Sequence, residues 1–266
     1  MDRARINGID IAYNISGKGD PVVLIGGFGM TKEGWADQIP PLEERFQVIT
    51  FDNRGVGEST VPEDPFTVND MAADVAGLLD HLGINRAHLF GVSMGGLITQ
   101  TLALDYPDRV LKAVLGCTSH GGRHAVQPKP EVMEVLASVA AAGISAEEAV
   151  RRRLPILFSE RFIREEPERV AAFVERSIRY QPTPQGAAGQ MQALSFFNVK
   201  RRLGEIRCPV LVMTGDEDQM MPPANARLLA DGISGAELYI VKGAGHSFFQ
   251  EQPEEVTRVL IDFFKK

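Results

Sequence analysis

The segment GVSMG at residues 91–95 matches the pattern G-x-S-x-G, which could carry nucleophilic chemistry at Ser93. An apolar segment typical of a strand precedes it and a helical pattern follows it, and this context is that of a nucleophile elbow. Such a tight turn strains the serine backbone and leaves no room for side chains at Gly91 and Gly95. It presents the Ser93 hydroxyl at the carboxyl end of a sheet, against the free N–H groups of a helix N-terminus. The alternative is a glycine-serine turn that only links a strand to a helix.

A serine hydroxyl needs a general base to become a good nucleophile, and that base is usually an oriented histidine. Of the five histidines, His246 follows a predicted strand and the glycine-rich turn at residues 242–245, so it lies at the carboxyl end of the sheet. His81 lies near the end of a predicted helix and His88 lies within a predicted strand, and both are interpreted as structural. The sequence therefore predicts His246 as the base.

A carboxylate that holds the histidine should follow a strand between the serine and the histidine in chain order. Asp216, Glu217 and Asp218 all follow the apolar segment at residues 209–214. A buried acid fixes the histidine tautomer and stabilises the imidazolium that forms during catalysis. Spacing alone leaves all three acids open.

A glycine-rich loop, GGFG at residues 26–29, follows the first predicted parallel strand. Backbone N–H groups in such a loop can bind an oxyanion, together with the N–H of the residue after the nucleophile. Those donors would be Phe28 and Met94. The alternative is an ordinary glycine-rich turn, although three strand-end motifs in the right order support one another.

The elements that would position these residues alternate between strand and helix. Two short strands are expected around the Asn7-Gly8 turn. Further strands are predicted at residues 21–25, 47–51, 87–90, 110–117, 209–214 and 237–241, and helices at 67–82, 95–106, 225–231 and 253–265. This order predicts an α/β fold with a mostly parallel, twisted sheet covered by helices on both faces.

The alternation stops between residues 120 and 205, where only helices are predicted, at 131–142, 146–157, 167–179 and 184–196. This segment is interpreted as a helical cap inserted into a core made of residues 1–119 and 206–266. Four apolar residues of the cap could line an acyl pocket or could equally pack the cap helices together. They are Met191, Leu194, Phe196 and Phe197.

Composition narrows the class of protein. The 266 residues are 44% hydrophobic and 24% charged, as in soluble globular chains, and the net charge of −7 argues against nucleic acid as a partner. The one basic run, at residues 151–153, lies among glutamates and predicts a solvated helix face. No segment is apolar enough to span a membrane, and the N-terminus does not resemble a signal peptide. Two cysteines without metal-ligand spacing predict a cytoplasmic protein with no disulfide framework and no zinc site.

Over nearly the whole chain except the cap, these motifs resemble the α/β-hydrolase superfamily, in its cap-bearing esterase, enol-lactonase and cofactor-free haloperoxidase branch. Residues 215–222 match the family pattern G-x-x-D-x-x-x-P, which implies Asp218 as the catalytic acid and Asp216 as second choice. Residues 243–246 resemble the histidine loop, and residues 251–254 the start of the last helix. The family usually has His-Gly where this chain has Gly26-Gly27, and the oxyanion role of Phe28 is expected to survive that change.

The resemblance implies a serine esterase without metal or organic cofactor. It would cleave small to medium acyl esters through an acyl-enzyme, with Ser93, His246 and Asp218 as a catalytic triad. A serine at position 93 disfavours the reactions of relatives with an aspartate nucleophile. The alternatives are enol-lactone hydrolysis, carbon–carbon hydrolysis or perhydrolysis, and more remotely a binding protein on the same scaffold. Carboxylate-bearing substrates would need a cationic anchor, such as Arg123, Arg161 or Arg179. The natural substrate and the oligomeric state are not predicted.

Overall fold

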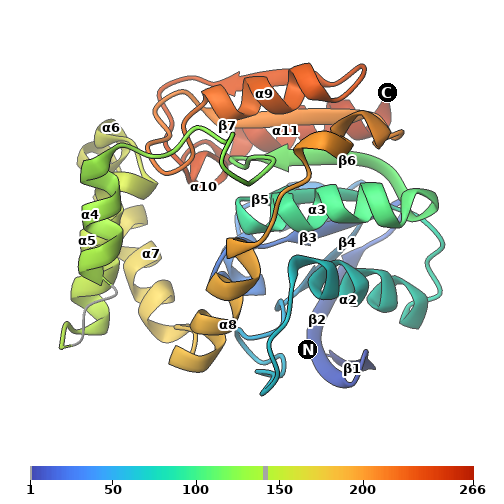
Figure 1. Ribbon diagram of the computed structural model, residues 1–266, viewed down its shortest axis with the longest axis horizontal. Coiled ribbons are helices and arrows are strands. Elements are labelled where there is room, and N and C mark those ends of the chain that lie inside the picture. The colour runs from blue at the N-terminus through green and yellow to red at the C-terminus, as the bar shows by residue number, and fades with distance from the viewer. Residues whose placement is uncertain (1, 140–142) are drawn as a thin grey trace.

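The computed structural model describes residues 2–139 and 143–266 of the chain. In the described residues the strands form one eight-stranded sheet in the order β1-β2-β4-β3-β5-β6-β7-β8 (Figure 1). The strands are β1 (Asp2–Ile6), β2 (Ile9–Gly17), β3 (Pro21–Ile25), β4 (Gln47–Phe51), β5 (Ala87–Val92), β6 (Val110–Gly116), β7 (Val210–Gly215) and β8 (Glu237–Val241). The predicted strands are therefore confirmed, with ends that differ by at most a few residues.

The sheet is antiparallel at one edge and parallel elsewhere. Strands β1 and β2 form the expected hairpin, in which Asn7 and Gly8 both have positive φ, as a tight two-residue turn requires. Strand β2 pairs antiparallel with β4, and every pairing from β4 to β8 along the sheet is parallel. Because parallel strands end at the same edge, loops far apart in sequence meet at one edge of this sheet.

Each strand sends alternate side chains to opposite faces, so the sheet has a separate hydrophobic core on either side. In β3, Val23 and Ile25 join one core, whereas Val22 and Leu24 join the other. The first core is covered by α2 (Val68–His81), α3 (Met94–Asp105) and α9 (Ala224–Gly232). The second is covered by α1 (Ile39–Glu43), α10 (Phe248–Glu251) and α11 (Pro253–Lys265). The expected layering of helices on both faces is confirmed.

Five α-helices lie between β6 and β7 in the described part of the chain. They are α4 (Pro130–Val139), α5 (Ala146–Leu157), α6 (Glu160–Glu165), α7 (Pro167–Arg179) and α8 (Pro184–Ser195), here called the inserted helices. Figure 1 shows α4 to α7 standing beside the sheet layers, with α8 leading back toward them. A small cluster of their own is built from α5, α6 and α7 and includes Leu154, Phe158 and Phe162.

The inserted helices follow the sequence prediction with one omission. Helices α5 and α7 have the predicted bounds, and α8 ends one residue early. The prediction at residues 131–142 agrees with α4 as far as residue 139, and its remainder lies outside the described residues. The sequence pattern did not predict α6, which has only six residues, is capped by the Ser159 hydroxyl and ends shortly before Pro167.

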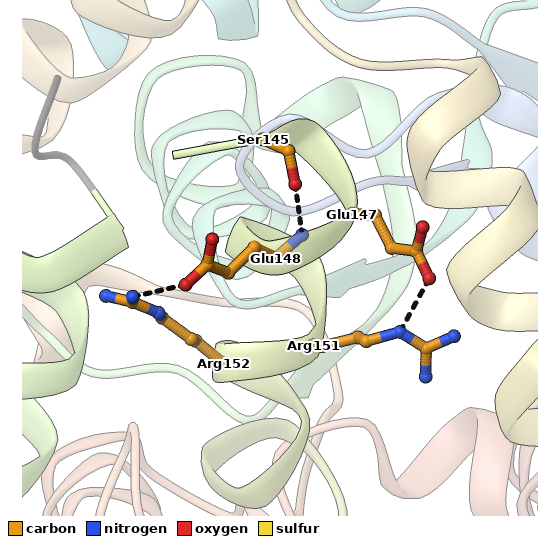
Figure 2. A pocket seen from close by; sticks show the side chains of 5 residues that line it. All are labelled: Ser145, Glu147, Glu148, Arg151 and Arg152. Carbon is orange, nitrogen blue, oxygen red and sulfur yellow. Dashed lines mark hydrogen bonds and ion pairs between the residues drawn. The ribbon is translucent and has the colours of Figure 1, made fainter. Parts of the chain in front are cut away.

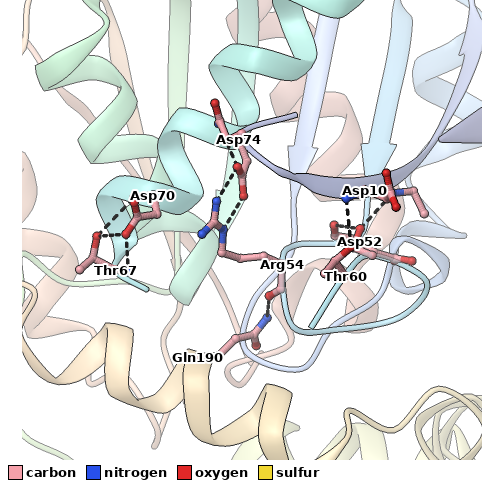
Figure 3. Close-up of polar contacts among 11 residues, drawn as sticks. Asp10, Asp52, Arg54, Thr60, Thr67, Asp70, Asp74 and Gln190 are labelled. Atoms are coloured by element: carbon pink, nitrogen blue, oxygen red, sulfur yellow. Dashed lines mark hydrogen bonds and ion pairs between the residues drawn. The ribbon is translucent and has the colours of Figure 1, made fainter. Parts of the chain in front are cut away.

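Ion pairs of the protein differ sharply in burial. In the core, Arg54 makes two hydrogen bonds to Asp74, at 2.6 and 2.7 Å, and both side chains are buried (Figure 3). On α5, Glu147 pairs with Arg151 and Glu148 pairs with Arg152 along the helix, and the four side chains line a shallow, open surface site (Figure 2). The prediction of a solvated helix face at this basic run is confirmed, since these four side chains are all exposed.

Within residues 2–139 and 143–266, no helix combines the length and the apolar character that crossing a membrane demands.

Candidate active site

Ser93 occupies a strained turn between β5 and α3. Its backbone has φ 54° and ψ −117°, a conformation that non-glycine residues rarely adopt. A Cβ atom at Gly91 would lie 2.1 Å from the Gly95 carbonyl oxygen, and one at Gly95 would lie 2.0 Å from that of Ile25. The two glycines therefore permit the turn, and the half-exposed Ser93 side chain is accessible from solvent.

The backbone of Ser93 is held from both sides. Its N–H donates to the Gly116 carbonyl at 2.8 Å, and its carbonyl accepts from the Thr118 hydroxyl at 2.8 Å. Both partners belong to the end of β6 and the loop after it. A neighbouring strand thus fixes the serine in the strained conformation that the turn requires.

The structure joins Asp218 and His246. Asp218 Oδ2 lies 2.8 Å from His246 Nδ1, and both side chains are buried. The other carboxylate oxygen, Oδ1, accepts the Met221 N–H at 2.7 Å, so both oxygens of Asp218 have fixed partners. A carboxylate held in this way orients the imidazole and selects the tautomer that carries its proton on Nδ1, which leaves Nε2 free to accept one.

The two other acids of the segment lie elsewhere. Asp216 is exposed and accepts the Gly243 N–H at 2.6 Å, with Lys242 Nζ 3.3 Å away. Glu217 is also exposed. The structure therefore brings Asp218, and neither neighbouring acid, to the histidine.

Ser93, Asp218 and His246 follow β5, β7 and β8 at the same edge of the sheet. The ends of these strands are level, because the register pairs Val92 with Gly116, Gly116 with Met213, and Gly215 with Val241. In the described chain, the Ser93 hydroxyl makes no hydrogen bond to His246. Contacts of this kind are often long in free enzymes and tighten when substrate binds.

The glycine-rich loop lies directly against the serine. A Cβ atom at Gly27 would be 3.3 Å from Ser93 Cβ, and Asn53 Nδ2 donates to the Gly26 carbonyl at 3.1 Å. Neither the Phe28 N–H nor the Met94 N–H donates to a protein acceptor within residues 2–139 and 143–266. Met94 is the first residue of α3, where an N–H has no partner inside the helix. Two N–H groups are thus left for a ligand near Ser93.

The unusual Gly26 is explained by its neighbour Met30. A Cβ atom at position 26 would lie 3.2 Å from the Met30 carbonyl oxygen and 3.4 Å from Met30 Cβ. A histidine at position 26, as is usual in the family that the sequence resembles, would therefore fit only if Met30 shifted.

A buried carboxylate that the sequence analysis did not single out connects the histidine loop to the inserted helices. Glu251 Oε1 accepts the Gly245 N–H at 2.7 Å and the Ser159 N–H at 3.0 Å, while Oε2 accepts the Ser159 hydroxyl at 2.5 Å. Burial raises the pKa of Glu251, and these hydrogen bonds partly offset the effect. The preference for Ser as a helix N-cap could have indicated Ser159, but nothing local indicated its partner.

Cys117 lies beside the site without being available for chemistry. It is fully buried, has φ 39°, and donates its N–H to the Met213 carbonyl at 2.8 Å. Burial raises the pKa of the Cys117 thiol, and the negative charge of Asp218 adds to the increase. The thiol therefore stays protonated, and Cys117 acts as a small buried residue of the core.

The four apolar residues proposed for an acyl pocket divide into two kinds. Phe197 and Leu194 pack against the main hydrophobic core. Met191 and Phe196 are 54% and 82% exposed. Packing thus accounts for the first pair, and a contact of any of the four with an acyl group stays a prediction.

The three arginines considered as carboxylate anchors have neighbours elsewhere. Arg123 lies beside His124, Arg161 approaches the Gly243 carbonyl at 3.4 Å, and Arg179 lies over the Tyr180 ring. These contacts include none of the three residues at the sheet edge. Across the described residues, no group of three or more His, Cys, Asp or Glu side chains is arranged to hold a metal ion.

The fold and this edge are those of a known class of protein. The sequence model described as alpha/beta hydrolase fold matches residues 20–253, so the chain belongs to the α/β-hydrolase family. Among curated proteins, "Putative carbamate hydrolase RutD" from Caulobacter sp. (strain K31) is 33% identical over 247 residues, covering 91% of this chain and 89% of that protein.

Two solved structures extend the comparison. The enol-lactonase from Burkholderia xenovorans LB400 superposes with a TM-score of 0.88 at 28% identity, over 100% of both chains. A thermophilic esterase from Thermogutta terrifontis, with malate bound, superposes with a TM-score of 0.85 at 31% identity, over 100% of this chain and 98% of that one. The expected fold, an α/β-hydrolase with a mostly parallel sheet, is thereby confirmed, and the chain is similar to hydrolases of several substrate classes.

Proposed function

We propose that this hydrolase cleaves carboxylic esters with small to medium acyl groups, using Ser93, His246 and Asp218 as a catalytic triad. The observation that carries the proposal is the strained, half-exposed Ser93 at the same sheet edge as the buried Asp218–His246 pair. Serine nucleophile, histidine base and orienting acid are the three roles that acyl transfer to water requires.

The reaction has two stages. His246 Nε2 takes the Ser93 proton as Oγ attacks the acyl carbon, and the protonated histidine then donates it to the departing alkoxide. Asp218 stabilises the imidazolium, and the N–H groups of Phe28 and Met94 bind the oxyanion, a contribution worth about 10²–10³ in rate for a single donor. Water activated by His246 then attacks the acyl-enzyme, releasing the carboxylic acid and restoring Ser93.

We assign the inserted helices, as part of a cap over residues 120–205, to substrate selection. They contact two loops that follow sheet strands: Pro182 lies near Gly29, and Ser159 bonds the carboxylate that also holds Gly245. These two contacts support a cap at the edge that carries Ser93.

We also place the protein in the cytoplasm, because both of its cysteines, Cys117 and Cys208, are free thiols.

The test is hydrolysis of p-nitrophenyl acetate, butyrate, octanoate and palmitate by the wild-type protein, by Ser93→Ala and by the exposed control Ser195→Ala. We expect activity that peaks at short or medium chains and falls by several orders of magnitude in Ser93→Ala only. Equal activity in Ser93→Ala would contradict the nucleophile. Equal rates on acetate and palmitate would contradict the limit on acyl size.

A second candidate is hydrolysis of an enol-lactone, which keeps the triad and changes the substrate. The likeness to the Burkholderia enol-lactonase over both entire chains favours it. A panel that adds an enol-lactone and an aryl carbamate separates the candidates by substrate. Each compound presents an acyl carbon to the same serine, so differences in rate report which substrate the site accepts. Activity on the lactone with none on simple esters would replace the first proposal by the second.

A further inference from the structure

One side chain of the inserted helices reaches the loop that lies against Ser93. Gln190, on α8, is 0% exposed. Its Oε1 accepts the Gly29 N–H at 2.9 Å, and its Nε2 donates to the Arg54 carbonyl at 2.9 Å. The amide orientation is unambiguous, because a backbone N–H can only donate and a carbonyl can only accept.

The hydrogen bond from Gly29 connects the Gln190 amide to the part of the loop that contacts Ser93. Gly29 is one residue after Phe28, and a Cβ atom at Gly27, on the other side of Phe28, would be in tight contact with Ser93 Cβ. The loop makes few other bonds of its own: the Gly26 carbonyl accepts from Asn53, and the Gly27 carbonyl accepts the Met30 N–H at 3.2 Å. Gln190 is thus the polar side chain that fixes the far end of the loop.

The amide nitrogen of Gln190 binds a residue, Arg54, whose own side chain has fixed partners. Arg54 is held by its paired hydrogen bonds to Asp74 and lies over the Phe66 ring, as Figure 3 shows for the arginine, the aspartate and Gln190. Helix α8 also contacts the loop that carries Arg54 directly through its backbone, since a Cβ atom at Gly186 would lie 1.9 Å from the Gly55 carbonyl oxygen. The helix cannot shift there without losing contact, so the amide is held in place.

We propose that Gln190 is a positioning residue that orients the Phe28 N–H toward the oxyanion formed at Ser93. The inference rests on the proposed function, because it assumes that Phe28 is an oxyanion donor. A donor stabilises the transition state only when it points at the oxygen that gains charge. Loss of the amide therefore slows the chemical step and leaves substrate binding largely unchanged.

The test uses the full chain and three variants. Gln190→Met removes both hydrogen bonds at similar volume, Gln190→Glu keeps the acceptor for Gly29, and Gln192→Met is a control at an exposed position of the same helix. The first readout is the rate at which a p-nitrophenyl alkylphosphonate modifies Ser93. In that reaction the Ser93 Oγ–P bond forms, p-nitrophenolate leaves, the serine proton passes to His246, and the P=O oxygen occupies the oxyanion position. The second readout is kcat and KM for p-nitrophenyl butyrate, per titrated site.

We expect Gln190→Met to lower the modification rate and kcat together by about 10- to 100-fold, less than or equal to the loss of a whole donor. KM should change little, Gln190→Glu should recover part of the rate, and Gln192→Met should match the wild type. If Gln190→Met lowers only the melting temperature or the number of titrated sites, with unchanged rates per site, the inference is wrong. If the wild-type protein is not modified at Ser93, the proposed function and this inference both fail, an outcome distinct from equal modification of all variants.

Discussion

The carboxyl edge of the sheet and the inserted helices are built in different ways. At the sheet edge, the backbone itself determines where the functional groups lie: Gly91 and Gly95 have no room for a side chain, and Ser93 is held by hydrogen bonds from the β6 end. In the inserted helices, side-chain packing determines position. Directly after α8, the adjacent phenylalanines at 196 and 197 have opposite environments.

One site can therefore combine a part fixed by local geometry with a part fixed by long-range contacts. The position of Ser93 depends on a turn that is encoded within five residues. The contact of Gln190 with Gly29 joins residues 161 positions apart. The edge should therefore tolerate almost no change, whereas the inserted helices should tolerate most changes except at the few side chains that reach the edge.

The largest effect is expected at the acid. Asp218→Asn should lower kcat/KM by about 10⁴-fold, because an amide favours the wrong histidine tautomer and cannot stabilise the imidazolium. Asp216→Asn, two residues away and exposed, should stay close to the wild type. Steady-state kinetics on one ester checks both variants. A large loss in Asp216→Asn with a small one in Asp218→Asn would reverse the assignment.

The next effect contrasts one buried ion pair beside the sheet with one exposed pair on the inserted helices. Asp74→Asn leaves the buried Arg54 without a counter-charge, which should cost about 3–5 kcal/mol of unfolding free energy. Glu147→Gln breaks an exposed pair on α5 and should cost only about 0.3–0.5 kcal/mol. Urea denaturation of both variants measures the difference. Similar losses of unfolding free energy in the two variants would show that burial of the ion pair does not determine its contribution to stability.

A smaller, pH-dependent effect is expected where the regions meet. Burial raises the folded-state pKa of Glu251 above its ordinary value of 4.5, so its favourable contribution is full below that value and is lost as pH rises through the folded pKa. A glutamine side chain at this position could keep several of the same hydrogen bonds without a charge. The stability of Glu251→Gln relative to wild type should therefore increase as pH rises from about 4.5.

Thermal or urea unfolding across that pH range, with the exposed Glu254→Gln as control, measures this change. Each unit of pKa shift corresponds to about 1.4 kcal/mol. A stability difference that is flat with pH, or that falls as pH rises, would contradict the prediction.

The smallest effect is expected at the surface of the inserted helices. Phe196→Ala should change the unfolding free energy by no more than about 0.5 kcal/mol, because the ring is mostly in solvent. Phe197→Ala, in contrast, removes a ring from the main core and should cost about 3 kcal/mol or more. A loss above about 1 kcal/mol in Phe196→Ala would mean that the ring is packed.

The sequence predicted the sheet edge well because its signals are local. Glycine spacing around Ser93 and the strand pattern before it need no information from other parts of the chain. Choosing Asp218 over Asp216 needed the family pattern, since spacing does not show which acid turns inward. Gln190 and Glu251 were missed because each acts through partners distant in sequence, and short α6 offers too few residues for a periodic pattern.

The core on the α11 face is built from residues near both ends of the chain. Val22 and Phe46 pack in one cluster with Leu260 and Phe264, so more than 200 residues separate its first and last members. Contacts of such long sequence separation form late and slowly. A nascent chain on the ribosome therefore exposes the apolar face of β3 and β4 until α11 has been translated. If translation stalls after Ser93 has been synthesised, we expect the incomplete chain to bind chaperones or, without them, to aggregate.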